Sequence, residues 1–436
     1  MTPEPVLMLM LANNIRDNAS ILHDFLSSNG HPSPSFHPGP VPDRNIIPPS
    51  SPPKVRNARS ILISSLRTLL DLVLGPAALL EDINSNDVLC MQLIHQYRIA
   101  QCFGPEEIIP FDELSRRCGL NVLDLTRVLR LVMTRHIFSE PSCGFVAHTA
   151  ATRLLLEDDR IRSFSSIICE ERFPASAKTA DALAKYGASH ASSQSGFSLA
   201  NGTECGLYEE LKKQPDRQER WNLAMSAMAA QVDVDFITNN VPFESYAPGS
   251  LCVDVGGGNG TISCSLVERL PNFRFLVQDV AAPPPLPPAS HSPDLNPPNG
   301  AAGLMAVDGD RVRWETHDFF SPQTVVGDIY YFRNIFHNWP DAQCVQILQQ
   351  HIPVLSTTTR LIIDDFTLHE PLTASPFEER RRRSMDITML IYFGAHERTV
   401  EQWRTILAKA DPRLRLAKVT RDAEQPNAIL EVVFEK

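Results

Sequence analysis

The chain lacks an excess of basic residues. Lysine and arginine together number 40 against 51 aspartates and glutamates, which gives a formal net charge of −11. A protein that binds nucleic acid through its phosphates needs a concentrated basic face. We therefore expect no nucleic-acid partner.

Paired cysteine motifs are also missing. The chain has 9 cysteines, an odd number, and they are scattered without CxxC spacing. Such a distribution is typical of free thiols in a reducing compartment, and it argues against a disulfide framework or a zinc site. We expect no bound metal and a cytoplasmic protein.

Long apolar runs are scarce as well. The stretch from Val6 to Ala12 is apolar but short, and Glu4 stands where a signal peptide would carry basic residues. We expect no segment long enough to span a bilayer, and no membrane partner.

A further absence lies within a glycine-rich turn. The run Asp254-Val-Gly256-Gly257-Gly258-Asn-Gly260 follows the apolar residues 251–253. The dinucleotide fingerprint GxGxxG would need a third glycine at position 261, where the chain has Thr261. The remaining GxGxG pattern still allows a backbone to lie against a bound ligand.

An acid ends the next predicted strand. Asp279 stands 25 positions after Asp254 (279 − 254), and an acid at this strand end can bind both hydroxyls of a ribose. A glycine turn and a ribose acid without a pyrophosphate cradle indicate a nucleoside site, which suits S-adenosylmethionine. A glycine turn in another kind of α/β domain is the alternative.

Composition and periodicity divide the chain into three predicted regions. Residues 1–58 contain a helix over 4–28 and a linker rich in Pro and Ser, and a second helical pattern covers 55–74. Residues 59–165 form a helical domain with a winged helix over 106–150. Residues 166–436 contain an α/β domain.

A winged helix often binds DNA, so its charge matters. Residues 111–150 carry five arginines (116, 117, 127, 130 and 135) and four acids (112, 113, 124 and 140), a segment charge of 5 − 4 = +1. A recognition helix in a major groove normally carries more positive charge. The segment therefore favours protein packing or dimerisation over DNA binding.

The α/β region predicts a mostly parallel, Rossmann-like sheet of seven strands. Strands that alternate with helices are expected over 251–255, 274–278, 312–316, 329–333 and 361–365, and an antiparallel closing pair over 414–420 and 428–434. The Pro-rich stretch 281–306 cannot join a central sheet, because its prolines remove backbone donors. We expect it to be a flexible insertion.

Three polar groups stand at or near strand ends, where open α/β sheets bind their ligands. The first runs from Arg333 through His337 to Asp341, the second is Asp364-Asp365, and the third is His396-Glu397-Arg398-Thr399. A lone histidine after a strand is more often structural than catalytic. Because the two later groups contain acids, a catalytic role for His337 becomes the favoured interpretation.

With these motifs, the chain resembles plant caffeic-acid-type O-methyltransferases and, more closely, fungal O-methyltransferases of secondary metabolism. The matching motifs are residues 253–260, the His-Asn-Trp-Pro-Asp run from His337, and His396-Glu-Arg-Thr399. The resemblance extends over nearly the whole chain. It implies a class I methyltransferase domain, S-adenosyl-L-methionine as cofactor, a homodimer and a small-molecule aromatic or polyketide acceptor.

The resemblance also implies roles for individual residues. The general base falls on His337, and the carboxylates that hold it fall on Glu397 and Asp365. Many relatives have Glu where Asp365 stands, so the neighbouring Asp364 remains an alternative. The implied cofactor contacts are Gly256, Gly257, Gly258, Asp279, Asp318, Phe319 and Arg333.

Other assignments stay open. Met and aromatic side chains suit a flat apolar ligand or a core equally, and we place Phe197, Met225 and Met389 in the acceptor pocket on that basis. Two competing hypotheses are a catalytically silent S-adenosylmethionine-binding scaffold of a biosynthetic pathway and a winged-helix DNA-binding regulator. The sequence does not identify the acceptor.

Overall fold

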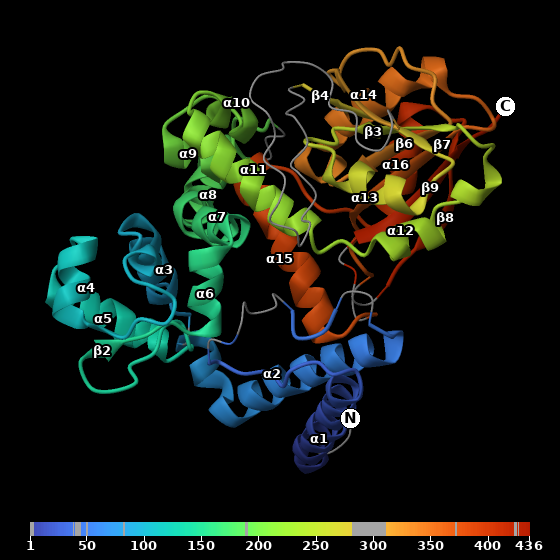
Figure 1. Cartoon of the computed structure of the whole chain (residues 1–436). Helices are drawn as coiled ribbons and strands as arrows, with labels where there is room; N and C mark the ends of the chain where they lie inside the picture. The colour runs from blue at the N-terminus through green and yellow to red at the C-terminus, as the bar shows by residue number, and fades with distance from the viewer. Residues whose placement is uncertain are drawn as a thin grey trace. The chain divides into compact units, whose positions relative to one another are not determined.

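The computed structural model describes residues 4–37, 39, 45–48, 51–81, 83–187, 191–280, 311–370, 373–422, 425 and 427–436 (Figure 1). The chain forms two compact units, one of Met1–Asp181 with Phe197–Met228, the other of Ala182–Gly196 with Ala229–Lys436. The expected boundary at residue 165 differs from this division, because helices well beyond it belong to the first unit. The predicted insertion 281–306 lies outside the described residues.

The first unit begins with the two expected helices. Helix α1 (Glu4–Ser28) and helix α2 (Pro53–Glu81) meet in a small apolar cluster around Leu22, Leu26 and Val55. Helix α2 is kinked, because Gly75 has a left-handed φ of 80° and Pro76 follows it.

Helix α2 corrects one expectation. It has 29 residues, and an 18-residue window of it has a mean hydropathy of 1.5 with only 6% of the window buried. By length and composition alone this helix could cross a membrane, so the expectation that no segment is long enough is wrong. A helix whose exposed apolar face binds another protein passes the same test of length and composition.

The winged helix has the predicted elements. Helices α4 (Phe111–Cys118) and α5 (Val122–Met133) are followed by strand β2 (Phe145–Val146), which pairs antiparallel with β1 (Ile109–Pro110). The side chain of Asn121 caps α5 by accepting the backbone N–H of Leu123 at 2.9 Å. Buried residues from these elements and from α3 (Asn86–Gln96) form one core.

The remaining elements of this part of the chain are helical. They are η1 (Ile99–Gln101), α6 (Ala150–Glu157), α7 (Asp159–Ile167), the π-helical turn η2 (Ile168–Arg172), α8 (Phe173–Tyr186), α9 (Gly196–Asn201), α10 (Leu207–Lys212) and α11 (Pro215–Ala229). In η2 the buried Glu171 receives the guanidinium groups of Arg217 and Arg220. This pairing satisfies a carboxylate that burial alone would destabilise.

The second unit is built on a seven-stranded sheet in the order β5-β4-β3-β6-β7-β9-β8. Its first five strands in the sequence are parallel, and β9 is antiparallel to both of its neighbours, as the sequence predicts. The strands are β3 (Leu251–Val255), β4 (Arg274–Asp279), β5 (Val312–Thr316), β6 (Ile329–Arg333), β7 (Arg360–Phe366), β8 (Leu414–Thr420) and β9 (Asn427–Phe434).

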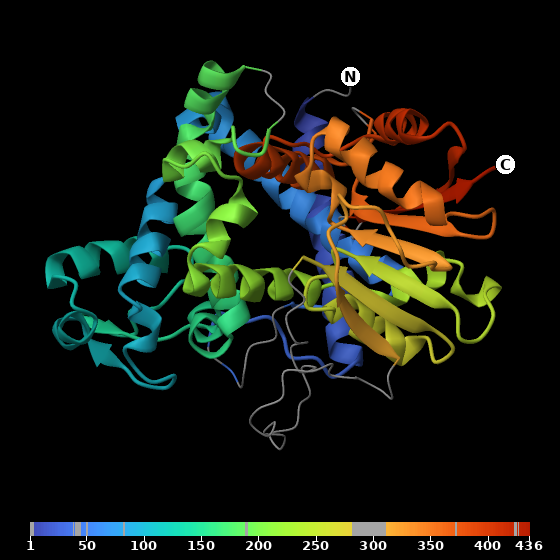
Figure 2. The same ribbon diagram turned by 90° about the horizontal axis from the view of Figure 1, so that it is seen from above.

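Helices cover both faces of this sheet (Figure 2). Side chains of α14 (Asp341–His351) and α16 (Val400–Ala410) pack on one face, and those of α12 (Val234–Asn240) and α13 (Thr261–Arg269) pack on the other. Helix α15 (Pro376–Phe393) and the short turns η3 (Phe243–Ser245), η4 (Phe336–Asn338) and η5 (Ile352–Val354) complete the unit. Two-sided cover explains why β3 and β6 are nearly continuous apolar runs.

Candidate active site

The five parallel strands bring their carboxyl ends to one edge of the sheet. The glycine turn follows β3, Asp279 ends β4, and Asp318 and Phe319 follow β5. His337 lies just after β6, and the paired acids lie near the end of β7. Residues predicted from separate motifs therefore meet at the edge where open α/β sheets bind ligands.

The glycine turn needs glycine for conformational reasons. Gly256 and Gly258 have φ values of 72° and 58°, a left-handed region that other residues rarely adopt. The N–H of Gly256 donates to the Gln278 carbonyl at 2.7 Å, and the N–H of Gly258 donates to Oδ2 of Asp279 at 3.0 Å. The predicted ribose acid thus also fixes the turn.

The turn is packed on one side and open on the other. A Cβ added at Gly256 would lie 2.5 Å from Cδ1 of Ile335, and one at Gly257 would lie 2.5 Å from Cγ of Asp254. Around Gly258 no described atom comes within 4 Å of such a Cβ. The backbone at Gly258 is therefore open on the side where a Cβ would project, and its N–H contacts the carboxylate of Asp279.

The other predicted cofactor residues have structural partners as well. Oδ1 of Asp318 accepts the N–H of Phe320 at 2.9 Å, and the Phe319 ring meets the Trp339 ring edge-on at 5.9 Å. Arg333 is ion-paired with Asp364. Arg333 ends β6 at the predicted position. Its contact with the cofactor stays a prediction, and in this structure its charge is paired with that of Asp364.

Asp254, which precedes the glycines, has a role that the sequence did not reveal. It is buried and accepts the hydroxyl of Ser263 at 2.6 Å, so it ties the turn to helix α13. Burial is the main cause that raises the pKa of Asp254 to about 6.

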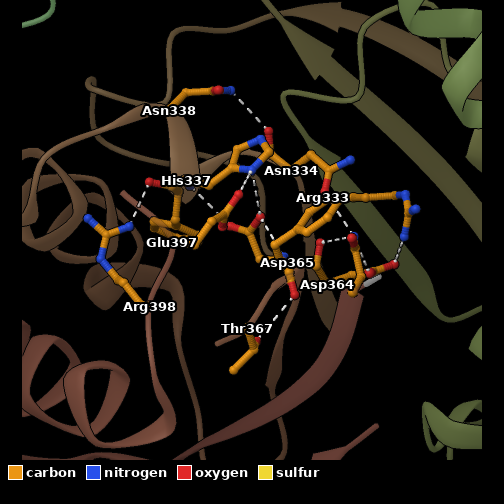
Figure 3. A network of polar contacts seen from close by, with 12 residues as sticks. Arg333, Asn334, His337, Asn338, Asp364, Asp365, Thr367, Glu397 and Arg398 are labelled. Atoms are coloured by element: carbon orange, nitrogen blue, oxygen red, sulfur yellow. Dashed lines mark hydrogen bonds and ion pairs between the residues drawn. The ribbon is translucent and has the colours of Figure 1, made fainter. Parts of the chain in front are cut away.

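His337 sits at the centre of a buried polar cluster (Figure 3). Its Nδ1 lies 2.9 Å from Oε1 of Glu397 and 3.5 Å from Oδ1 of Asp365. The backbone N–H of His337 donates to Oδ2 of Asp365 at 3.2 Å. The structure therefore brings together the three residues that the sequence singled out.

Strand geometry separates the two neighbouring acids. Consecutive residues of a strand point to opposite faces, so Asp364 and Asp365 diverge. Asp365 contacts His337, whereas Asp364 receives the hydroxyl of Tyr331 and the guanidinium of Arg333. The geometry thus favours Asp365 as the neighbour of the imidazole.

Arg398 holds the loop that carries His337. It is 1% exposed, and its guanidinium donates to the carbonyls of Phe336 at 3.0 Å and Trp339 at 2.7 Å. It also pairs with Asp341 at 2.9 Å. The adjacent residues 397 and 398 therefore fix the imidazole and its loop together.

Burial controls the electrostatics of the cluster. It lowers the pKa of His337, while Asp365 and a hydrogen bond from the ring to the backbone of Asn334 oppose that shift. Burial raises the pKa of Asp365 to about 7. It also raises the pKa of Glu397 well above its ordinary value, and Glu397 Oε2 has no hydrogen-bond partner among the described residues. Burial in the cluster therefore favours the neutral form of the imidazole and of both acids.

The predicted acceptor residues lie in different units. Phe197 in α9 is 0% exposed and lies under the guanidinium of Arg217, 5.4 Å from the ring centre. Met225 belongs to α11 of the same unit, and the buried Met389 belongs to α15 of the second unit. Their assignment to an acceptor pocket stays a prediction.

The cluster also has the donor set of a cation site. One ligand atom from each of His337, Asp365 and Glu397 lies within 4.8 Å of the others. Each of these contacts is accounted for by hydrogen bonding, because Nδ1 faces Glu397 and both oxygens of Asp365 accept backbone N–H groups. An imidazole supported by acids explains the geometry without an ion.

Comparisons with known proteins agree with this site. The O-methyltransferase domain family matches residues 183–411. The chain is 32% identical to O-methyltransferase pyvH of Aspergillus violaceofuscus, over 98% of both chains. It is 30% identical to the chlorophenol O-methyltransferase of Trichoderma longibrachiatum, over 98% of this chain and 90% of the relative.

The chain belongs to the O-methyltransferase family, in the branch that includes enzymes of fungal secondary metabolism. It is an S-adenosyl-L-methionine-dependent O-methyltransferase that acts on a small molecule. The crystal structure of OxaC in complex with SAH and oxaline has the same fold, with a TM-score of 0.71 and 22% identity over 98% of this chain and 100% of the other.

Two glycines of the turn provide a matched test of the cofactor cradle. Gly256→Ala and Gly258→Ala both place a side chain at positive φ, which costs about 1–2 kcal/mol. Only Gly256→Ala also crowds Ile335, so we expect it to lower the Tm and the affinity for S-adenosylmethionine more than Gly258→Ala does. Thermal unfolding and calorimetric titration measure both effects. Equal losses would contradict the packing described here.

Our expectation that the site needs no metal ion is testable by chelation. We expect methyl transfer to be unchanged after exhaustive treatment with a strong chelator, because hydrogen bonds already hold Nδ1 of His337 and both oxygens of Asp365. Metal analysis of the treated protein is the control. A loss of activity that a divalent cation restores would show that the cluster holds a metal.

Proposed function

We propose that this enzyme methylates a hydroxyl of an aromatic or polyketide-derived molecule in secondary metabolism, with His337 as the general base. The observation that carries the proposal is the contact of 2.9 Å between Nδ1 of His337 and Glu397 in a buried setting. In the tautomer in which Nδ1 donates its proton to Glu397, Nε2 carries the lone pair that can accept a proton. That lone pair is the base.

The proton transfer has an energetic cost that the site must offset. A free phenol has a pKa of ~10 and a free imidazole one of ~6.5, so transfer is uphill by roughly 5 kcal/mol at ~1.36 kcal/mol per unit. Burial, which lowers the pKa of His337, makes the ring a still weaker base. Other groups must therefore stabilise the imidazolium as it forms.

The described residues supply that stabilisation. A carboxylate behind Nδ1 becomes a stronger partner once the ring is charged, which is the logic of an acid that supports a catalytic histidine. The backbone carbonyl of Asn334 accepts a hydrogen bond from the protonated ring and so favours that form. Both groups are fixed before reaction and need no rearrangement.

The cofactor supplies a positively charged methyl donor, which also favours the phenolate form of the acceptor. The protein contributes position: the glycine turn and His337 stand at the ends of adjacent strands β3 and β6. Methyl transfer needs oxygen, carbon and sulfur nearly in line, so correct placement supplies much of the rate.

The names of two relatives support a phenolic acceptor. One relative methylates chlorophenol, and another, from Cladonia grayi, belongs to a grayanic acid biosynthesis cluster. Met389, a buried residue of α15, has an apolar side chain of the kind that suits a flat aromatic ligand. Reduced thiols across the chain favour a cytoplasmic enzyme.

Replacement of His337 tests the base. We expect His337→Gln to lower kcat with chlorophenol by about 10²–10⁴-fold, since that is the usual contribution of a general base. Binding of S-adenosylmethionine, measured by calorimetry, should be retained. Undiminished methylation by His337→Gln would remove the base role. No methylation of any phenol by the wild type, with tight cofactor binding, would favour the silent scaffold.

We also infer that the enzyme is a homodimer that forms through α1 and α2. Among the exposed apolar side chains of α2, Leu70 is 56% exposed, Val73 64% and Leu80 78%. A stable interface buries about 800 Å² on each partner, and a long apolar helix face can provide that area. In a twofold-symmetric dimer, the same apolar face of α2 from a second copy of the chain would cover this face.

Analytical ultracentrifugation tests this assembly. The wild type should sediment as a dimer of the 48.6 kDa chain. The double substitution Leu70→Glu with Val73→Glu should give monomers, because it buries charge in the interface. Leu183→Glu, at an apolar residue of α8 that is 48% exposed, is the control and should remain dimeric. A monomeric wild type, or wild-type binding to lipid vesicles, would contradict the inference.

A further inference from the structure

A third carboxylate stands behind the His337 cluster. Asp386 lies on α15, two turns before the end of that helix at Phe393. Its Oδ1 accepts the backbone N–H of Glu397 at 2.9 Å. No motif in the sequence connects Asp386 with His337, because the two are joined only through the fold.

The chain reverses sharply to make this contact. Gly394 ends α15 with a left-handed φ of 61°, which lets the chain turn back along the helix. The N–H of Gly394 donates to the carbonyl of Leu390 at 3.2 Å. This reversal of the chain brings the backbone N–H of Glu397 to Asp386, and it brings the Glu397 carboxyl group to Nδ1 of His337.

The contact fixes the backbone of Glu397 from the side of α15. Arg398 anchors the next residue to the His337 loop, and the N–H of Leu368 at the end of β7 donates to the Arg398 carbonyl at 2.9 Å. Asp386 is the anchor on the α15 side. Helix α15 is capped at its start, where Ser375 and Glu378 form a capping box.

We propose that Asp386 is a positioning residue for the His337 base: it orients Glu397 through the backbone and places a second negative charge behind it. The inference rests on the proposed function, since it assigns the support of that base. Asp386 has no contact with His337 among those of the described residues, so it acts only through Glu397.

The charge has a definite consequence. Asp386 adds to burial in raising the pKa of Glu397, while Arg398 and Arg382 oppose it. Removal of the Asp386 charge favours the ionised form of Glu397, and an ionised Glu397 stabilises the imidazolium. The pKa of His337, which Asp365, Arg398 and Arg333 also influence, should therefore rise.

Two substitutions separate the hydrogen bond from the charge. Asp386→Asn keeps an oxygen that accepts the Glu397 N–H but removes the charge, whereas Asp386→Ala removes both. Glu379→Gln is the matched control, because Glu379 is an acid of the same helix whose side chain pairs with Arg383 at 2.7 Å. It should behave as the wild type.

The readout is a pH titration of His337 by NMR of the full-length enzyme labelled with ¹⁵N-histidine, with the signal identified by its loss in His337→Gln. We expect the His337 pKa to rise by about 0.5–1 unit in Asp386→Asn. In Asp386→Ala, kcat with chlorophenol should also fall about tenfold, with little change in KM, because the carboxylate loses its position.

The outcomes distinguish the two proposals. An unchanged His337 titration in both Asp386 variants, whether or not their Tm falls, would leave Asp386 a purely structural residue and overturn the inference. If His337→Gln remains fully active, the base role itself fails, whereas the titration still reports whether Asp386 acts on Glu397.

Discussion

The account depends on one contact, between the buried Nδ1 of His337 and the carboxylate of Glu397. An imidazole and two carboxyl groups are costly to remove from water. They persist here because each group satisfies another: Asp365 accepts the His337 N–H, and Glu397 faces the ring. The contact with Glu397 holds Nδ1, and the base role that we propose for His337 depends on it.

The rest of the second unit serves this contact. Parallel strands place the glycine turn, His337 and Asp365 at one edge of the sheet, and strand alternation turns Asp364 away from the imidazole. The loop after β6 is then held by Arg398. The glycine turn and the proposed base therefore follow neighbouring strands of one sheet, and a site built on strands is placed more precisely than one built on loops.

The strands were readily predicted from sequence, and β3, β5, β6 and β8 have the expected bounds. Their apolar runs are set by local burial on both faces. The choice between Asp364 and Asp365 needed the register of β7, which a pattern of two adjacent acids does not contain. The roles of Arg398 and Asp386 could not be predicted from the sequence, because their contacts join residues that become neighbours only in the fold. Helix α2 was underestimated because its apolar length is interrupted by Gly75 and Pro76.

A crystal structure of the enzyme with S-adenosylhomocysteine and a phenol tests the central claim most directly. The account predicts that Nε2 of His337 lies within about 2.6–3.2 Å of the phenol oxygen while Nδ1 still faces Glu397. A phenol oxygen bound by another side chain, with the His337 ring turned away from it, would contradict the account.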